Sequence, residues 1–149
     1  MKGKTKILLA ALALTTLCLT LIGMHEYKRV NKSLNDSKED FRTNTTDLLT
    51  EFEQHETRAQ SLYVGKIIAI TGKIKTLEKD EKGYFTIVLA PDASNSSIRC
   101  SMDTIESQNL ANLLPSTNIS IKGFVLGYNA DVTGILGSDI LLNRCILLK

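Results

Sequence analysis

Hydrophobic and polar positions divide this chain into two different parts. The 18 residues from Ile7 to Met24 are uncharged and mostly apolar, and as a helix they would span about 27 Å at about 1.5 Å per residue. After Met24, apolar and polar residues mix in ordinary proportions. Because a helix that is apolar on every side needs lipid or a large core around it, the first segment predicts a membrane-inserted helix.

The flanks of this segment decide between several fates for it. Three lysines lie before it, namely Lys2, Lys4 and Lys6. A basic flank followed by an apolar stretch is typical of signal anchors and of secretory signals. We predict an uncleaved signal anchor over residues 1–24, because no small-x-small cleavage pattern follows. A lipoprotein modified on Cys18 is the first alternative, although Leu17 stands where a lipobox has a small residue, and a cleaved signal is the second. All three export the rest of the chain.

Two short regions connect this segment to the main body. Residues 25–44 are polar, mixed in charge and without apolar periodicity, which predicts a flexible tether. Residues 45–63 carry apolar positions at helical spacing, with Thr45 or Thr46 as the N-cap and acidic residues in the early turns. We therefore predict one amphipathic helix over 45–63, whose apolar stripe packs on the domain that follows.

The body from Val64 to Lys149 predicts five strands and one short helix. The inward positions of the first three strands follow a period of two. They are Ile68, Ile70, Gly72 and Ile74, then Phe85, Ile87 and Leu89, then Ile98, Cys100 and Met102; the outward set includes Val88. Gly72 in mid-strand indicates a bulge or a sharp bend. Asp103 and Glu106 in capping-box spacing predict a helix over 103–114. Residues 118–128 and 138–148 form the last two strands, joined by a loop over 131–138.

The order of three strands, a helix and two strands is that of an OB-fold, a small closed barrel of five strands. We therefore predict an all-β fold with short helices: a five-stranded OB-fold barrel over residues 64–149, preceded by the transmembrane or signal helix and the amphipathic helix. An open sheet with a helix packed on one face is the alternative architecture.

Several motifs of the body also resemble a known family. They are Tyr63-Val64-Gly65-Lys66, Arg99-Cys100-Ser101-Met102-Asp103, Lys122-Gly123, Gly137-Ser138-Asp139 and Leu142-Asn143-Arg144-Cys145. Together with the apolar N-terminus, these pieces resemble the tRNA anticodon-binding-like OB-fold family of exported bacterial proteins, often described as OB-fold lipoproteins. Relatives often carry a further Cys in the fourth strand, where this chain has Leu126. The resemblance implies the fold, an envelope location and no catalytic residues.

Charge and aromatic content bear on what such a barrel binds. From Val64 onward the numbers of basic and acidic residues are nearly equal. Because phosphate contacts supply most of the affinity for nucleic acid, this balance argues against a nucleic-acid partner. A mild basic patch is expected on the outer face of the first three strands, formed by Lys73, Lys75, Tyr84, Thr86, Arg99 and Ser101. This set is our candidate site for an envelope protein or an anionic glycan; a merely solvated barrel exterior is the alternative.

The rest of the sequence contains few candidates for catalytic or metal-binding residues. The histidines are His25 and His55, both outside the predicted barrel, and no nucleophile-elbow serine or phosphate-binding glycine loop occurs. We expect no enzymatic activity, no cofactor and no metal site. Cys100 and Cys145 lie on strands that pair in an OB-fold, so they form either a disulfide in an oxidising compartment or two small core residues.

These observations combine into one functional prediction. The chain is expected to be a membrane-anchored, non-enzymatic OB-fold binding or structural module of the bacterial cell envelope, with the barrel on the exported, periplasmic side. A module that binds single-stranded nucleic acid is the main alternative. A subunit that binds only protein is the third, and it would expose an apolar patch on the helix over residues 46–62.

Overall fold

The computed structural model describes residues 34–103, 110 and 113–148, together with Thr16, Cys18 and Thr20. The chain divides into two compact units, Met1–Asp36 and Ser37–Lys149. In the first unit, Thr16, Cys18 and Thr20 are helical and Leu34–Asp36 form a short 3-10 helix, η1. Within the described residues, no helix combines the length and apolar character needed to cross a membrane. The predicted segment Ile7–Met24 lies mostly outside them.

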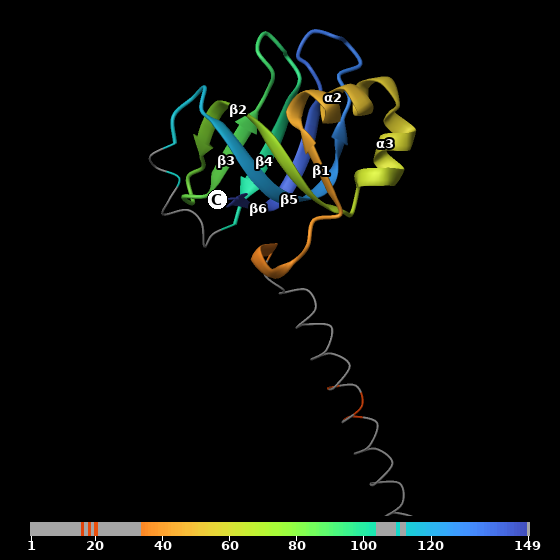
Figure 1. Ribbon diagram of the computed structural model, residues 1–149, viewed down its shortest axis with the longest axis vertical. Coiled ribbons are helices and arrows are strands. Elements are labelled where there is room, and N and C mark those ends of the chain that lie inside the picture. Colours follow the sequence, from red (N-terminus) through yellow and green to blue (C-terminus); the bar gives the residue numbers. More distant parts are fainter. Residues whose placement is uncertain are drawn as a thin grey trace, which may run out of the picture. The chain divides into compact units, whose positions relative to one another are not determined.

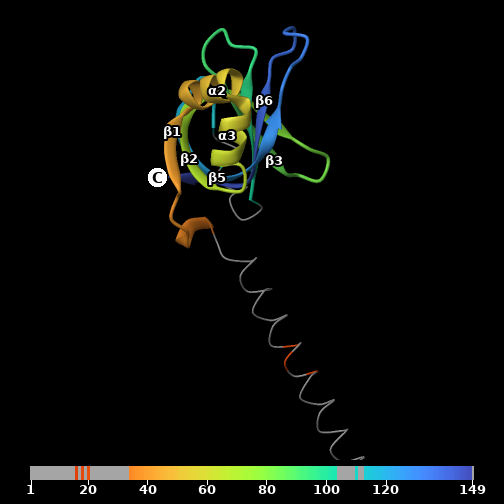
Figure 2. The ribbon, with the colours of Figure 1, turned by 90° about the vertical axis from the view of Figure 1, so that its right-hand side faces the viewer.

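The second unit is a closed barrel with two helices at one end (Figures 1 and 2). Its elements are β1 (Phe41–Asn44), α2 (Thr45–Gln54), α3 (Glu56–Tyr63), β2 (Ile67–Lys79), β3 (Phe85–Leu89), β4 (Ser97–Met102), β5 (Asn118–Asn129) and β6 (Asp139–Leu148). The sheet order is β1-β2-β3-β4-β6-β5, and a further pairing of β2 with β5 closes the ring. The predicted OB-fold is confirmed, and the open-sheet alternative is wrong.

The long strand β2 belongs to both sides of the barrel because it bends in the middle. Its first half pairs with β5, from Ile67 opposite Phe124 to Lys73 opposite Asn118. Its second half pairs with β3, with a register shift between Ile74 and Thr76. The bulge or bend that Gly72 predicts is therefore present, close to this shift.

The core follows the predicted alternation of the strands. Its confirmed members are Ile68, Ile70 and Ile74 of β2, Ile87 and Leu89 of β3, and Ile98, Cys100 and Met102 of β4. Phe85, at the start of β3, is half-buried. Val88 was predicted to face solvent but is buried. It lies in the middle strand of three, opposite Thr76 of β2 and Arg99 of β4, so it has a neighbour on each side.

Strand β1 is a feature that the sequence did not predict. Phe41 to Asn44 pair in parallel with Ile68 to Thr71 of β2, so the segment predicted as a tether to residue 44 ends in the sheet. β1 and β3 occupy the same edge of β2, one along each half. Because an unpaired strand edge is a template for aggregation, β1 protects the half that β3 leaves open.

The single predicted helix is two helices in the structure. The N-cap is Asn44, whose side chain accepts a hydrogen bond from the Asp47 backbone, so the predicted caps Thr45 and Thr46 are wrong. His55, with φ −137° and ψ 50°, has non-helical backbone angles and separates α2 from α3. Helix α2 lies across one end of the barrel (Figure 1).

The apolar stripe of these helices is covered by the barrel. Leu48, Leu49 and Phe52 of α2 and Ala59 of α3 are buried in the main core. The exposed helical patch that would favour the protein-only subunit is therefore missing at these positions. The predicted helix over 103–114 lies mostly outside the described residues. Leu110, which is described, is fully buried in the core.

Candidate functional site

The candidate site lies on the outer face of β2, β3 and β4, and strand register sets which of its side chains are neighbours. Thr86 of β3 is directly opposite Ser101 of β4, and Glu78 of β2 is opposite Thr86 on the other side. One row along, Val88 separates Thr76 from Arg99. Thr86, Arg99 and Ser101 therefore lie together on β3 and β4.

Arg99 is joined to a carboxylate on the same face. Its Nη2 atom lies 2.6 Å from Oε2 of Glu78, so the pair spans β3 diagonally. Both side chains are partly exposed, which limits the contribution of such a pair to stability to about 0–1 kcal/mol. Its chemical effect matters more, because the guanidinium charge is already offset by a carboxylate.

The two candidate lysines turn towards the loop between β3 and β4. Lys73 Nζ contacts both carboxylate oxygens of Asp92, at 2.8 and 3.0 Å. Lys75 Nζ donates to the Ser94 carbonyl at 3.2 Å. Lys75 lies within the register shift between Ile74 and Thr76, and Lys73 lies before it, whereas Glu78 lies after it. Lys73 and Lys75 thus form a second group, apart from Arg99.

Tyr84 lies in the turn between β2 and β3, just before β3 begins. Asp80 organises this turn, because its Oδ1 atom accepts hydrogen bonds from the backbone N–H groups of Lys82 and Tyr84. Tyr84 is 50% exposed. The six candidate residues therefore form three separate groups, and two of their three cations are held in ion pairs with carboxylates.

Cys100 and Cys145 are buried free thiols in the barrel core. Cys100 lies opposite Leu142, while Cys145 lies opposite Met102 after a register shift in the β4–β6 pairing. Burial raises the pKa of the Cys145 thiol, and a hydrogen bond with Cys100 raises that pKa further. The disulfide remains a prediction from the sequence. Cys18, the candidate for lipidation, is exposed in the first unit.

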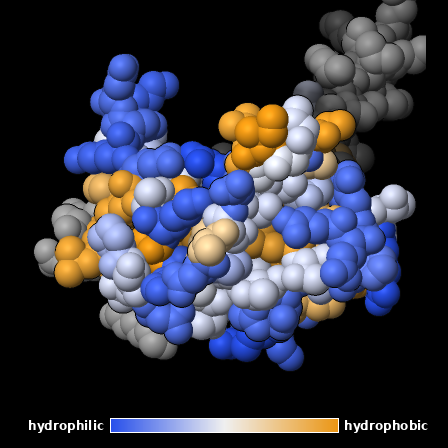
Figure 3. All heavy atoms as spheres, turned by 90° about the horizontal axis from the view of Figure 1, so that it is seen from above, coloured by the Kyte–Doolittle hydropathy of each residue, from blue (hydrophilic) through white to orange (hydrophobic). Residues whose placement is uncertain are grey.

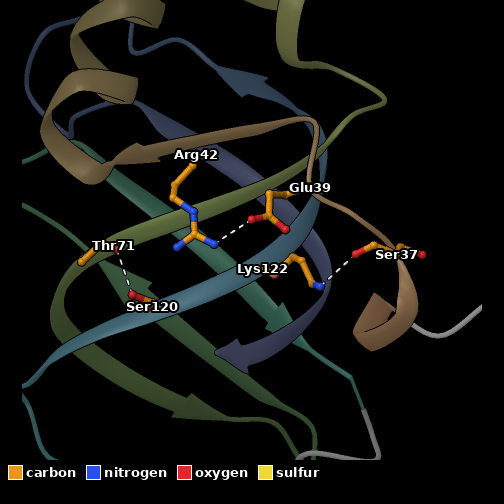
Figure 4. A network of polar contacts seen from close by, with 6 residues as sticks. All are labelled: Ser37, Glu39, Arg42, Thr71, Ser120 and Lys122. Carbon is orange, nitrogen blue, oxygen red and sulfur yellow. Dashed lines mark hydrogen bonds and ion pairs between the residues drawn. The ribbon is translucent and has the colours of Figure 1, made fainter. Parts of the chain in front are cut away.

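A buried lysine of β5 bonds to the segment that precedes β1 (Figure 4). Lys122 of β5 is only 5% exposed, and its Nζ donates to the Ser37 carbonyl at 2.9 Å. Nearby, Arg42 Nη2 lies 2.6 Å from Glu39 Oε1. The hydrogen bond from Arg42 is the largest cause that lowers the pKa of Glu39. These contacts lie on the β1 side of the barrel, so Lys122 has a structural role.

The loop between β5 and β6 was predicted from the sequence only as a connection, but it forms a distinct surface feature. Its residues Val132, Ile135 and Leu136 are strongly exposed. Asp131 organises the loop from within: its Oδ1 accepts from the Thr133 backbone, and its Oδ2 accepts from the backbones of Leu136 and Gly137. The signal in the sequence was an Asp two residues before a Thr, followed by two aliphatic residues between glycines.

A cavity of about 370 Å³ opens beside this loop. Its walls come from Glu53 of α2, Glu56 of α3, Tyr128 of β5 and the two loops that precede β4 and β6. A second cavity of about 340 Å³ lies at the start of α2 and includes the Lys73–Asp92 pair. Among the described residues, no group of three His, Cys, Asp or Glu side chains is placed to hold a metal ion.

The sequence matches a family model over residues 1–146, the tRNA_anti-like family. The chain belongs to the tRNA_anti-like family. This confirms the predicted resemblance, and the motifs that carried it lie on the barrel strands and their flanks. No curated protein matches the sequence of this tRNA_anti-like protein.

Solved structures share the fold of this tRNA_anti-like protein. A proposed nucleic acid-binding lipoprotein of Klebsiella pneumoniae matches with a TM-score of 0.55 and 18% identity, over 72% of this chain and 91% of that one. At this identity the likeness shows the fold alone.

Two aminoacyl-tRNA synthetases match more weakly. A proposed aspartyl-tRNA synthetase of Leishmania major has a TM-score of 0.46 and 11% identity, over 78% of this chain and 22% of that one. The asparaginyl-tRNA synthetase of Pyrococcus horikoshii has a TM-score of 0.40 and 12% identity, over 59% of this chain and 21% of that one. This chain thus spans about a fifth of each synthetase, and nothing about function follows from either match.

Proposed function

We propose that this protein is a non-enzymatic binding or structural module of the bacterial cell envelope, held at the membrane by its N-terminal segment. The observation that carries the proposal is the division of the chain. An uncharged segment of nearly membrane-spanning length precedes a barrel whose core cluster comes from residues 48 to 145. A segment of that length and apolar character is stabilised by lipid around it.

The non-enzymatic part of the proposal rests on residue chemistry. A general acid or base is most often a histidine, and the barrel from Val64 onward contains none. Glu78, Asp80 and Asp92 of the candidate face and its loops already serve in ion pairs or turns, and Asp131 of the β5–β6 loop does so as well. A binding role does not require a histidine or a free carboxylate on this surface.

A single-stranded nucleic acid is the less favoured ligand. OB-folds bind oligonucleotides on the face of the second and third barrel strands and through the loops after the first and fourth barrel strands. In this protein these are strands β3 and β4, the β2–β3 turn and the β5–β6 loop. Here the cations Lys73 and Arg99 are paired with Asp92 and Glu78. The corresponding loop between β5 and β6 carries an aspartate and no basic residue. Binding of phosphates by Lys73 or Arg99 would have to break these ion pairs.

Membrane attachment is tested on native membranes. Mass spectrometry of the mature N-terminus distinguishes an intact anchor, a lipidated Cys18 and a trimmed chain. We expect the intact N-terminus and retention in the membrane pellet after carbonate extraction. Recovery of a trimmed chain in the soluble fraction would contradict the anchoring.

The ligand class is tested by titrating the full chain with single-stranded RNA at several salt concentrations. Phosphate-dominated binding weakens steeply as salt rises, because each neutralised phosphate releases counterions. We expect no binding with such a slope. A steep slope, corresponding to several phosphates, would replace our proposal with the nucleic-acid alternative.

The face of β2–β4 is tested by reversing its three charges together, Lys73→Glu, Lys75→Glu and Arg99→Glu. We expect the triple variant to retain less anionic glycan or envelope protein in a pull-down from envelope extracts. A control with Lys38, Arg58 and Lys66 changed to Glu carries the same net charge, and these three residues are exposed outside strands β2–β4. Equal retention by both variants would rule out this face as the binding site.

A further inference from the structure

The β5–β6 loop presents an apolar surface to solvent. Val132 is 98% exposed, Ile135 73% and Leu136 82%. In the view from above, apolar side chains stand out in orange over this end of the barrel, among mostly hydrophilic neighbours (Figure 3). Single exposed aliphatic residues are ordinary, but three within five positions on one loop form a patch that favours contact with another molecule.

The loop is already ordered before any partner arrives. The Asp131 carboxylate accepts from Thr133 N at 2.9 Å, from Leu136 N at 2.7 Å and from Gly137 N at 2.9 Å. Ser138 N donates to Ser96 Oγ at 3.1 Å, which ties the base of the loop to the start of β4. Since binding then has less chain entropy to overcome, the apolar side chains are displayed at low cost.

The cavity beside the loop has the opposite character, because it is acidic. Glu53 and Glu56 contribute carboxylates from the two helices, and Asp131 contributes one from the loop. None of the residues that line this cavity is a lysine or an arginine. Tyr128 adds an aromatic wall, with its ring centroid 5.1 Å from that of Phe52. Such a cavity suits a cationic group.

These charges decide which partner fits the apolar loop. Loops and helices that enter lipid usually carry basic or aromatic residues next to their aliphatic ones, because bacterial and other anionic membranes attract cations. Here the neighbours are Glu53, Glu56 and Asp131, which an anionic lipid surface would repel. A polypeptide with aliphatic residues for the loop and a lysine or arginine for the cavity satisfies both features.

We propose that the β5–β6 loop and its adjacent acidic cavity form a docking surface for a basic, amphipathic segment of a partner protein. Aliphatic side chains of that segment pack on Val132, Ile135 and Leu136, and a cationic side chain enters between Glu53 and Glu56. This surface is distinct from the face of β2–β4. It does not depend on how the N-terminal segment is anchored.

The test uses the full chain in nanodiscs of zwitterionic phosphatidylcholine, with empty nanodiscs as the background. The probe is a fluorescent synthetic peptide of leucine and lysine with a helical repeat, titrated by anisotropy. We expect binding above background that the double variant Ile135→Ser and Leu136→Ser weakens by about tenfold or more. Glu56→Gln should weaken binding several-fold, with a larger effect at low salt.

Matched controls separate this surface from general stickiness. Leu126→Ser changes an exposed leucine of β5, and Glu81→Gln changes an exposed glutamate of the β2–β3 turn. Both should bind the peptide as the wild type does. All these positions are exposed, and a thermal melt of each variant verifies that the barrel is intact.

Three results would overturn the proposal. The first is wild-type binding no stronger than the background, or binding by the Ile135→Ser and Leu136→Ser double variant that equals that of the wild type. The second is equal binding of a leucine–glutamate peptide of the same repeat. The third is flotation with phosphatidylglycerol vesicles that depends on Ile135 and Leu136, which would assign the loop to a lipid surface. Carbonate extraction is read separately, so failure of the anchor and failure of this docking surface are distinguishable.

Discussion

Thr45 occupies the space in front of Gly72. A Cβ atom added at Gly72 would lie 1.8 Å from Thr45 Oγ1, far inside contact distance. The same hydroxyl donates to the Thr71 carbonyl at 3.3 Å. The first turn of α2 thus rests directly on the bend of β2, and the absence of a side chain at Gly72 permits this approach.

Gly72→Ala should therefore destabilise the barrel by about 1–3 kcal/mol, the usual cost of overpacking. Thr45→Ala in the same chain should recover part of the loss, because it removes the hydroxyl that the new methyl group meets. Urea unfolding of the two single variants and the double variant gives the coupling free energy. Additive effects of the two substitutions would contradict the contact.

Lys122→Met should loosen the segment from Ser37 to Asn44 that leads into the barrel. It removes the donor to the Ser37 carbonyl, and loss of one partner of a buried hydrogen bond costs about 1–3 kcal/mol. Limited proteolysis should cut between Ser37 and Asn44 faster than in the wild type, before the barrel unfolds. The control is Lys66→Met, which changes an exposed lysine. Equal cutting rates in both variants would exclude this role for Lys122.

The order of the β5–β6 loop should depend on pH through Asp131. Hydrogen bonds from Thr133 and Gly137 hold the pKa of this carboxyl well below its ordinary value of 3.8. A lowered folded-state pKa means that the stabilisation is complete above the ordinary pKa and is lost as pH falls towards the lower one. Protection of the Leu136 and Gly137 amides from hydrogen exchange should therefore decrease below about pH 4.

Asp131→Asn should remove this dependence, with low protection at every pH. The matched control is Asp92→Asn, which changes a carboxylate of another loop that pairs with Lys73. It should leave the loop amides as they are in the wild type. Protection that is constant from pH 6 to pH 3 in the wild type would contradict the role of Asp131.

The core cysteines should be inaccessible in the folded protein. Both thiols are buried and free, and burial raises the pKa of Cys145, so its reactive thiolate is scarce. Differential alkylation with peptide mapping should label Cys100 and Cys145 only after denaturation, without any reductant. Labelling that also requires a reductant would show that the disulfide forms in the native compartment.

Most of the barrel could be predicted from the sequence because local alternation determines it. Ile68, Ile70, Ile87 and Ile98 mark their strands by period alone, and burial of one face fixes the register. β1 could not be predicted, since Phe41–Asn44 contain a single apolar residue and pair with β2 through backbone bonds. The break at His55 likewise has no local signature in the sequence.

The candidate face was predictable as a set of positions but not as a charged surface. The contacts of Lys73 with Asp92 and of Arg99 with Glu78 join residues about twenty positions apart. Which carboxylate meets which cation depends on the register shift between Ile74 and Thr76, and composition does not reveal it. The sequence likewise predicted a loop over 131–138 but not the hydrogen bonds of Asp131 that fix it with Val132, Ile135 and Leu136 exposed.

The position of β6 in the ring determines when the barrel can be completed. β6 pairs with both β4 and β5, and it follows all the other described strands in the sequence. As the polypeptide leaves the ribosome, the ring stays open until β6 emerges, because β4 and β5 have no other described strand to join them. The interval in which the ring is open is therefore set by the time needed to synthesise β6 after β5.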